Sequence, residues 1–381
     1  MANESQPPSL PPKFPHAMLR EIHEQPQAIR ETVRRNVEGD IIFPRALEPL
    51  ETALLAFKKI IIAASGSSRH AGLAGEIMIE DLAGVAVDVE YASEYCYRST
   101  HAGADPIVMV ITQSGETADT IAAQREALAR GAETVAISNV ADSTISREAT
   151  ARLHTFAGPE RAIPATKSFT AQLTILYLFS LFLARRLGRM TSEVIRGRLN
   201  ELCAIPEGIE RCLAVWDAEA QNCARLFQPT RSFLFLGRGV HYAIAREGAL
   251  KLKEISYVQA EGLPAGELRH GPNALVDERL TTIVLAARDD ADADSVVRYE
   301  KTLGVLEYVK ARGGRAVAVA TEGDLEIPAL ADRVFFVPRA PELLLPILEV
   351  VPLQLFAYHF AVLGGSDVDN PRNLVKAVVS E

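Results

Sequence analysis

Cysteine is scarce in this sequence, and the four cysteines among its 381 residues are widely spaced. None of them forms a Cys-x-x-Cys pair or lies beside a pair of histidines. Such groupings mark zinc sites and redox motifs, and densely spaced cysteines mark disulfide-rich secreted domains. We therefore expect a reduced, cytoplasmic protein without a metal centre. No cluster of residues points to an organic cofactor.

The sequence also has no excess of positive charge, because it contains 49 acidic residues and 40 lysines and arginines. Proteins that bind nucleic acids usually concentrate positive charge on the face that meets the phosphate backbone. We expect no nucleic-acid partner.

No apolar run is long enough to cross a bilayer, for which about 20 residues are needed. The longest run, residues 173–184, is interrupted by polar residues and ends at two arginines. We interpret it as a buried helix and expect no membrane partner. Residues 1–17 are polar and proline-rich, lack a secretion signal, and are expected to form a flexible tail.

The sequence is rich in short β-branched runs that alternate with longer helical patterns. Nearly half of the residues, 48%, are apolar, which is enough for two domains with cores of their own. Alternation of this kind predicts an α/β fold with parallel sheets covered by helices on both faces. Strands are expected at 60–63, 87–91, 107–111 and 134–137, and again at 232–236, 281–286, 316–320 and 333–337.

The pattern occurs twice. After a helical stretch at 170–227, IIIAASGSSRHAGLAGE is matched by FLFLGRGVHYAIAREGA, each an apolar strand, a small-residue turn and an amphipathic helix. Neither turn has the glycines of a dinucleotide-binding fingerprint. We predict a helical lead-in and first domain at 18–205, a second domain at 206–365, and a C-terminal tail at 366–381.

Two loops of the first domain carry hydroxyl side chains between a strand and a helix. One contains Ser67 and Ser68, and the other runs from Thr112 to Thr117. Hydroxyl groups and backbone N–H groups at a helix N-terminus can bind a phosphate without a lysine. The alternative is that these residues only cap helices. Two such loops at equivalent strand ends favour a site.

A helix in the second half presents an acid and a base together, because Lys251 and Glu254 are three residues apart and share a face. Proton transfer between adjacent sugar carbons needs a carboxylate base and a cation near the oxygen that gains charge. The alternative is that Glu247 and Lys251 form an ordinary ion pair on a solvated face.

Two further residues have chemistry that suits a sugar substrate. His270 lies in a glycine- and proline-rich loop, and an imidazole can serve the proton transfers that open a sugar ring. Lys376 lies in an apolar C-terminal tail, where a desolvated amine could form a Schiff base with a ketone. Either residue could instead be an ordinary surface residue.

Taken together, these segments resemble the sugar isomerase (SIS) domains of the glutamine:fructose-6-phosphate amidotransferases, the glucosamine-6-phosphate synthases. The resemblance begins at residue 18 and covers nearly all of the remaining chain. It is carried by MLREIHEQPQAI, VDVEYASEY, TQSGETADT, AISNVADSTISREAT, AGPERAIPATKSFTAQL, FLGRGVHYAIAREGALKLKEISYVQAE, PAGELRHGPNALVDE, VPLQLFAYH and DVDNPRNLVKAVVSE.

The resemblance implies two tandem flavodoxin-like SIS domains with a C-terminal tail that closes the active site. Glu254 would move the proton between C1 and C2, and Lys251 would assist at O1. His270 would open the ring, acting in the neighbouring subunit of a homodimer, and Lys376 would form an imine with the open-chain ketose. The sugar phosphate would be held by Ser67, Ser68, Thr112, Gln113, Ser114 and Thr117.

The sequence also departs from the family pattern. It resembles only the isomerase half and shows no glutaminase domain, so ammonia is expected to come from solution or from a partner. The segments SGSSRH and IPATKSF differ from the usual family sequence beside the substrate, which leaves the sugar open. The primary hypothesis is conversion of fructose 6-phosphate and ammonia to glucosamine 6-phosphate. The alternatives are a deaminase, an enzyme for another aminosugar, or a non-catalytic sugar-phosphate sensor.

Overall fold

The computed structural model describes residues 14–57, 59–98 and 106–379. The expected N-terminal tail falls outside this range up to residue 13, and the chain is helical from Ala17. A short lead-in precedes the first domain. It comprises α1 (Ala17–His23), α2 (Gln25–Asn36), the hairpin of β1 (Val37–Glu38) and β2 (Ile41–Ile42), the 3-10 turn η1 (Glu48–Leu50) and α3 (Ala53–Ala56).

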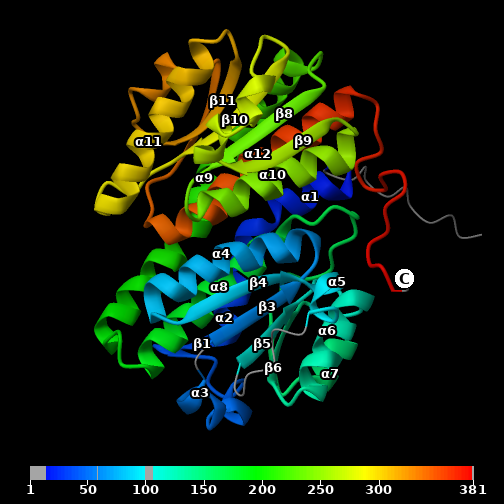
Figure 1. Ribbon diagram of the computed structural model, residues 1–381, viewed down its shortest axis with the longest axis vertical. Helices are drawn as coiled ribbons and strands as arrows, with labels where there is room; N and C mark the ends of the chain where they lie inside the picture. Colours follow the sequence, from blue (N-terminus) through cyan, green and yellow to red (C-terminus); the bar gives the residue numbers. More distant parts are fainter. Residues whose placement is uncertain (1–13, 58, 99–105, 380–381) are drawn as a thin grey trace, which may run out of the picture.

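Two five-stranded parallel sheets lie one above the other (Figure 1), which confirms the predicted α/β architecture. In both sheets the second strand along the chain lies at the edge beside the first, the order of flavodoxin-like folds. The first sheet is β4 (Ala86–Tyr91), β3 (Lys59–Ala64), β5 (Pro106–Ile111), β6 (Glu133–Ser138) and β7 (Ala151–His154). The second is β9 (Gln259–Pro264), β8 (Ser232–Gly237), β10 (Leu280–Ala286), β11 (Arg315–Thr321) and β12 (Arg333–Val337).

Helices cover both faces of each sheet, as the alternating side chains of the strands require. Ile60 and Ile62 of β3 join the core beneath one set of helices, whereas Ile61 and Ala63 join the core beneath the other. The helices of the first domain are α4 (Gly66–Ala83), α5 (Ala92–Tyr95), α6 (Ala118–Ala129), α7 (Thr144–Glu148) and α8 (Lys167–Arg186). Those of the second are α10 (His241–Ser256), α11 (Ala293–Lys310), α12 (Leu345–Leu363) and the short 3-10 turns η2 (Ala265–Arg269), η3 (Pro272–Leu275), η4 (Ile327–Ala329) and η5 (Glu342–Leu344).

The alternating pattern does not predict β7 or β9, which are edge strands. The sequence of β9, QAEGLP, lacks the run of β-branched residues that marks a strand. Gly262 is needed there, because a Cβ atom would lie 2.5 Å from the Cα atom of Arg246 in α10. Close packing against a helix therefore determines this strand more than its local sequence does.

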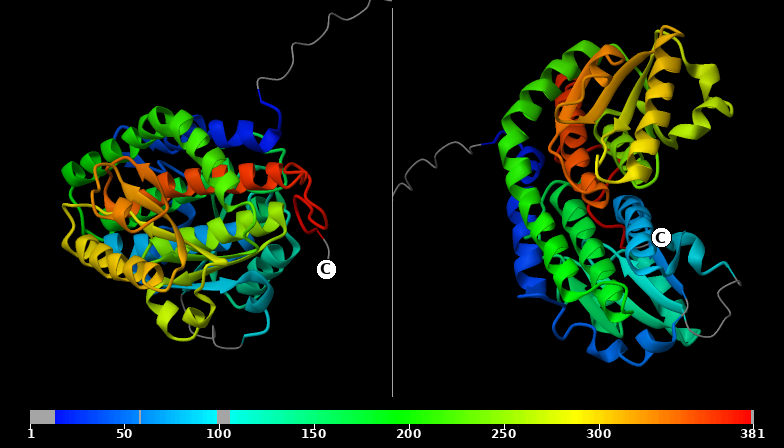
Figure 2. Two further views of the ribbon diagram at one scale, coloured as in Figure 1. Left: turned by 90° about the horizontal axis from the view of Figure 1, so that it is seen from above. Right: turned by 90° about the vertical axis from the view of Figure 1, so that its left-hand side faces the viewer.

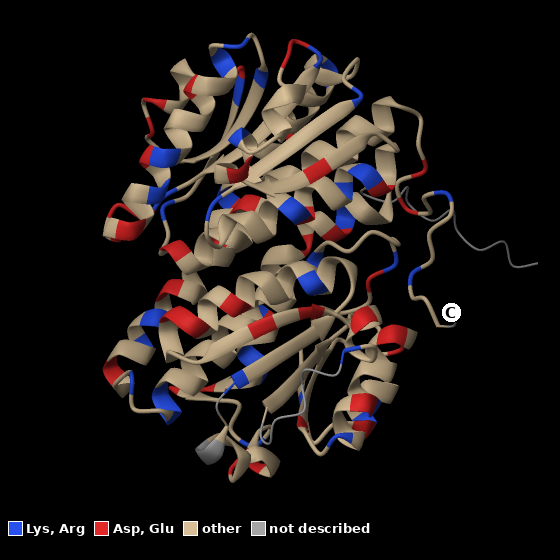
Figure 3. Cartoon of the chain, viewed as in Figure 1, with Lys and Arg blue, Asp and Glu red and all other residues tan. Residues whose placement is uncertain are grey.

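A long helix and a shared core connect the two domains. Helix α9 (Ser192–Phe227) has 36 residues and runs along both domains (Figure 2), so the limit expected between residues 205 and 206 lies inside it. One cluster of buried apolar side chains includes residues from α4, α8, α10 and α12, and α4 contacts α10 directly. The domains therefore meet through packed helices. Lysines and arginines are interspersed with acidic residues over both domains (Figure 3).

Helix α8 is longer than the apolar run that the sequence marks, and it has 20 residues. By length and composition alone, α8 and the stretch Glu342–Leu363 could span a membrane. Within the protein, 94% and 89% of their apolar windows are buried. Both are core helices here, in agreement with the interpretation of residues 173–184 as buried.

Candidate active site

The two hydroxyl-bearing loops lie at neighbouring strand ends of the first sheet. Ser67 and Ser68 are in the first turn of α4, directly after β3, and residues 112–117 connect β5 to α6. Strands β3 and β5 are adjacent and parallel, so the loops share the sheet edge where ligands bind in this fold. Gly115 (φ +72°) is required in the second loop, because a Cβ atom there would lie 2.0 Å from Ser143 Oγ.

The side chains of these loops are partly engaged with one another. Thr112 Oγ1 lies 2.7 Å from Thr117 Oγ1, and Ser114 Oγ accepts a hydrogen bond from the backbone N–H of Glu116. Ser68 Oγ accepts a hydrogen bond from Gln172 of α8 at 3.0 Å. Neither the side chain of Ser65 before α4 nor that of Thr117 before α6 caps its helix. Neither side chain therefore competes with an anion at its helix N-terminus.

The C-terminal tail lies directly beside the second loop. The carbonyl of Val378 accepts a hydrogen bond from the backbone N–H of Ala118, the first residue of α6. Further back, Asp369 accepts two hydrogen bonds of 2.8 Å from the N–H groups of Ala17 and Met18, and so caps α1. These contacts hold the tail, drawn in red in Figure 1, against the first domain.

The tail places Lys376 beside a buried carboxylate. Lys376 Nζ donates to Glu160 Oε2 at 2.7 Å and to the carbonyl of Ala162 at 2.6 Å. Glu160 also accepts hydrogen bonds from the N–H groups of Thr166 and Ser168. Burial alone would raise the pKa of Glu160, but the charge of Lys376 and these donors together lower it below its ordinary value. Glu160 is therefore ionised and holds the Lys376 amino group in place.

Lys251 and Glu247 of α10 are buried, and Glu254 is partly buried, which excludes the solvated-face alternative. Lys251 is 1% exposed, and its Nζ lies 2.6 Å from Glu254 and 3.6 Å from Glu247. Burial alone would lower the pKa of Lys251, but the charges of Glu254, Glu247 and Glu160 outweigh it and raise the pKa. The charge of Glu160, which pairs with Lys376, thus also acts on Lys251.

Glu247 links the second domain to the loop of the first. Its carboxylate, 0% exposed, accepts a hydrogen bond from Ser67 Oγ at 2.8 Å and contacts His70 Nδ1 at 2.9 Å. Together with Lys251, these contacts join the first turn of α4 to the acid–base pair of α10. Neither Glu247 nor Glu160 is among the predicted site residues. The only sequence signal for Glu247 is its spacing of four from Lys251, because its partners lie about 180 residues away.

His270 is the one predicted catalytic residue that the structure does not join to the others. It follows η2 in the second domain and is exposed. Its backbone N–H donates to the carbonyl of Glu267, and no side-chain hydrogen bond or ion pair of His270 occurs within residues 14–57, 59–98 and 106–379. Gln113 likewise makes no side-chain hydrogen bond in this part of the chain, although its backbone carbonyl accepts from Asn139.

Comparison with known proteins matches this geometry to a family. The SIS domain family model matches residues 54–181 and 226–364, one match for each sheet. The chain belongs to the SIS domain family. The solved structure of the C-terminal domain of glucosamine-fructose-6-phosphate aminotransferase from Francisella tularensis matches with a TM-score of 0.88 and 35% sequence identity. The match covers 94% of this chain and 99% of that one.

Curated proteins with a similar sequence are named as aminotransferases of fructose 6-phosphate. Glutamine–fructose-6-phosphate aminotransferase (isomerizing) from Chlorobaculum tepidum is 45% identical over 372 residues, which are 97% of this chain and 59% of the relative. The chain thus spans about three fifths of the length of that relative. Glucosamine-6-phosphate deaminase from Thermotoga maritima has a TM-score of 0.69 at 20% identity and shows the common fold alone.

Proposed function

We propose that this SIS protein converts fructose 6-phosphate and ammonia into glucosamine 6-phosphate and water. The observation that carries the proposal is the position of Lys376, paired with the ionised Glu160 in a tail that touches the first residue of α6. An amine there lies beside the expected phosphate-binding loops. The names of the relatives in the two comparisons above support the synthetic direction and this substrate.

In the proposed mechanism the phosphate binds at the N-termini of α4 and α6, held by Ser67, Ser68, Thr112, Gln113, Ser114 and Thr117. Lys376, held by Glu160, reacts as the free amine and attacks the C2 carbonyl. Both amine protons leave with the carbonyl oxygen as water when the imine forms. Ammonia then replaces the lysine at C2. Glu254 takes a proton from C1 and returns it to C2, while Lys251 stabilises the charge on O1. One sugar and one ammonia are consumed, and one water is released.

We further propose that a homodimer completes the site. His270 is exposed on the surface of the second domain, a position from which it could reach the site of a second copy. In the proposal, the partner subunit's His270 opens the sugar ring. Separately, the small number and wide spacing of the cysteines support the proposal of a cytoplasmic setting.

The dimer can be tested by mixing two inactive variants, His270→Asn and Lys376→Met. If the histidine acts across the interface, a mixed dimer contains one site with both substitutions and one intact site. About a quarter of the wild-type activity is then expected when subunits exchange freely in equal amounts. No recovery on mixing, with heterodimers shown to form, would place His270 in its own subunit's site.

Trapping the imine tests the proposed function. Borohydride reduction in the presence of fructose 6-phosphate should attach one sugar phosphate to the peptide that contains Lys376, as read by mass spectrometry. Lys376→Arg keeps the charge but cannot form the imine, and should remain unlabelled. Labelling of another lysine, or equal labelling of the wild type and Lys376→Arg, would contradict the assignment of Lys376 as the residue that forms the imine. Retained sugar-phosphate binding without any adduct would favour the sensor instead.

A further inference from the structure

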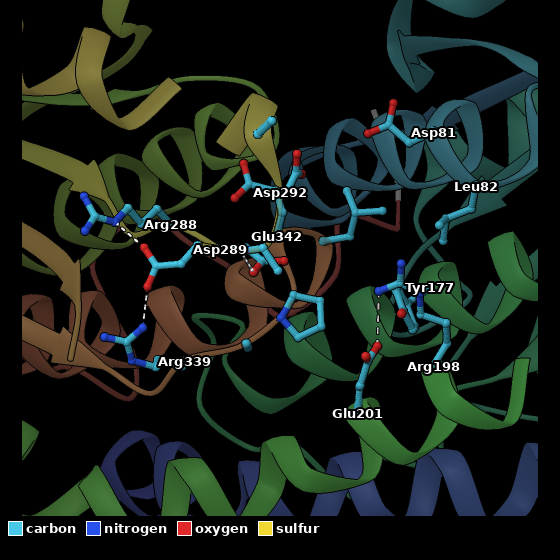
Figure 4. A pocket seen from close by; sticks show the side chains of 16 residues that line it. Asp81, Leu82, Tyr177, Arg198, Glu201, Arg288, Asp289, Asp292, Arg339 and Glu342 are labelled. Atoms are coloured by element: carbon cyan, nitrogen blue, oxygen red, sulfur yellow. Dashed lines mark hydrogen bonds and ion pairs between the residues drawn. The ribbon is translucent and has the colours of Figure 1, made fainter. Parts of the chain in front are cut away.

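The second domain has its own cavity at the sheet edge that corresponds to the active site of the first. A cavity of about 730 Å³ lies beyond the C-terminal ends of β10 and β12 and is lined by residues 288–293 and 339–343 (Figure 4). The opposite wall comes from the first domain, through Asp81, Tyr177, Arg198 and Glu201. Its loop after β10 is the counterpart of the loop after β5 in the first sheet, because each follows the third strand of its domain in the same strand order.

The chemistry of this cavity is unlike that of the first domain. The loop after β5 carries hydroxyl groups, whereas the equivalent loop after β10 carries Asp289, Asp290 and Asp292. Asp292 caps α11 by accepting hydrogen bonds from the N–H groups of Asp294 and Ser295. A carboxylate of the protein thus occupies the helix N-terminus that would otherwise bind a phosphate. The cavity is not a second phosphate site.

A buried ion network adjoins the cavity through Glu342. His241, 3% exposed, lies 2.8 Å from Glu349 and 3.1 Å from Glu342, and Glu342 also accepts a hydrogen bond from Arg298 at 2.8 Å. Burial alone would lower the pKa of His241, but the charges and hydrogen bonds of the two glutamates raise it to about 10. Glu342, which lines the cavity, is therefore neutralised within the protein.

Six carboxylate side chains and three arginines line the cavity. Each arginine is already paired, Arg198 with Glu201 and both Arg288 and Arg339 with Asp290. Asp81 has no hydrogen bond or ion pair within the described part of the chain, and the Asp289 side chain accepts only the N–H of Ala291. Unmatched negative charge therefore faces the cavity from both domains.

A buried polar group also points to a ligand. Tyr177 of α8 lines the cavity, its side chain is 1% exposed, and its hydroxyl group has no hydrogen-bond partner among the residues that the structure describes. The hydroxyl group is accessible from the cavity, where a ligand or water can bond to it. Burial raises the pKa of Tyr177, so its hydroxyl stays neutral and can both donate and accept a hydrogen bond.

We propose that this cavity binds a small organic cation that carries hydroxyl groups, of the class of a free amino sugar. Its ammonium group would lie between Asp81 and Asp289, and a hydroxyl group would bond to Tyr177. Burial, followed by the charges of Glu80, Asp292 and Asp294, raises the pKa of Asp81, although the charge of Arg298 acts in the opposite direction. A bound cation would lower this pKa. The ligand would contact both domains. The inference is argued from this cavity alone, and only its test uses the proposed binding of fructose 6-phosphate to the first domain.

Titration calorimetry at pH 6.5 tests the proposal, with glucosamine as the probe and glucose as its neutral counterpart. Saturating fructose 6-phosphate blocks the site in the first domain. Glucosamine should bind at one site, at least tenfold more tightly than glucose, because a charge-assisted hydrogen bond is lost in glucose. Equal binding of the two sugars, no binding, or competition between glucosamine and fructose 6-phosphate would each overturn the proposal.

Substitutions locate the site. Asp81→Asn and Tyr177→Phe should each weaken glucosamine binding, the former by about tenfold. Glu207→Gln removes one negative charge from the exposed face of α9 without lining the cavity and should leave binding unchanged. If Asp81→Asn and Glu207→Gln have the same effect, net charge accounts for the binding and the proposed site is wrong.

Discussion

Replacement of Glu247 by glutamine should loosen the contact between the two domains at the active site. The carboxylate is fully buried, and its Oε1 atom lies 3.6 Å from Lys251 Nζ. At an effective dielectric constant of about 20, this pair is worth on the order of 4 kcal/mol before desolvation is counted. A glutamine can still accept one of the hydrogen bonds from Ser67 and His70, but not both. Burying a neutral amide also costs less than burying a carboxylate.

The net loss expected from Glu247→Gln is therefore about 3 kcal/mol of the free energy of unfolding, the usual cost of breaking a buried ion pair from one side. The matched control is Ser67→Ala, which removes one hydrogen bond and leaves the charge pair intact, at a cost of about 1 kcal/mol. Thermal and urea unfolding at pH 7.5 measure both. If Glu247→Gln costs no more than Ser67→Ala, the carboxylate is not the ionic link between the domains.

Two further predictions concern packing and ionisation. Gly248→Ala should destabilise the protein by about 1–3 kcal/mol, because its Cβ would lie 2.8 Å from both Leu353 and Phe235. Gly304 lies in open space within α11, so Gly304→Ala should stabilise the protein by about 0.5–1 kcal/mol. Urea unfolding of both variants checks this, and a stable Gly248→Ala protein would contradict the packing. Burial, helped by Glu80 and Asp88, raises the pKa of Glu76 to about 7, compared with 4.5 for the unfolded chain. Ionising Glu76 therefore lowers the free energy of unfolding as the pH rises from 4.5 through 7. Glu76→Gln should therefore raise the melting temperature at pH 8 more than at pH 5, and an equal gain at both values would refute the assignment.

Much of the fold follows from the sequence because parallel strands are apolar on both faces. Runs such as that of β3 are recognisable without any knowledge of their neighbours. The edge strand β9 is different, because it is defined by contact with α10 through Gly262, and nothing in its own six residues marks a strand. The length of α9 could not be predicted either, since Pro206 lies inside the helix rather than at its end.

The candidate site was predictable where its residues are close in sequence. Lys251 and Glu254 share a helix face, and the two hydroxyl loops follow neighbouring strands. Glu160 and Glu247 act through partners 216 and 180 residues away, so no local pattern identifies them. Lys251 is buried because α10 packs against α4. This packing joins distant parts of the sequence, so the burial of Lys251 could not be predicted from its local sequence.

The most direct test of the central claim is the rate of glucosamine 6-phosphate formation from fructose 6-phosphate and ammonium, measured by mass spectrometry for the wild type and Glu254→Gln. The account predicts turnover by the wild type and its loss in Glu254→Gln, with fructose 6-phosphate binding retained within a few fold because the phosphate loops are untouched. Absence of any product from a wild-type protein that binds the sugar phosphate, or nearly full activity in Glu254→Gln, would contradict it.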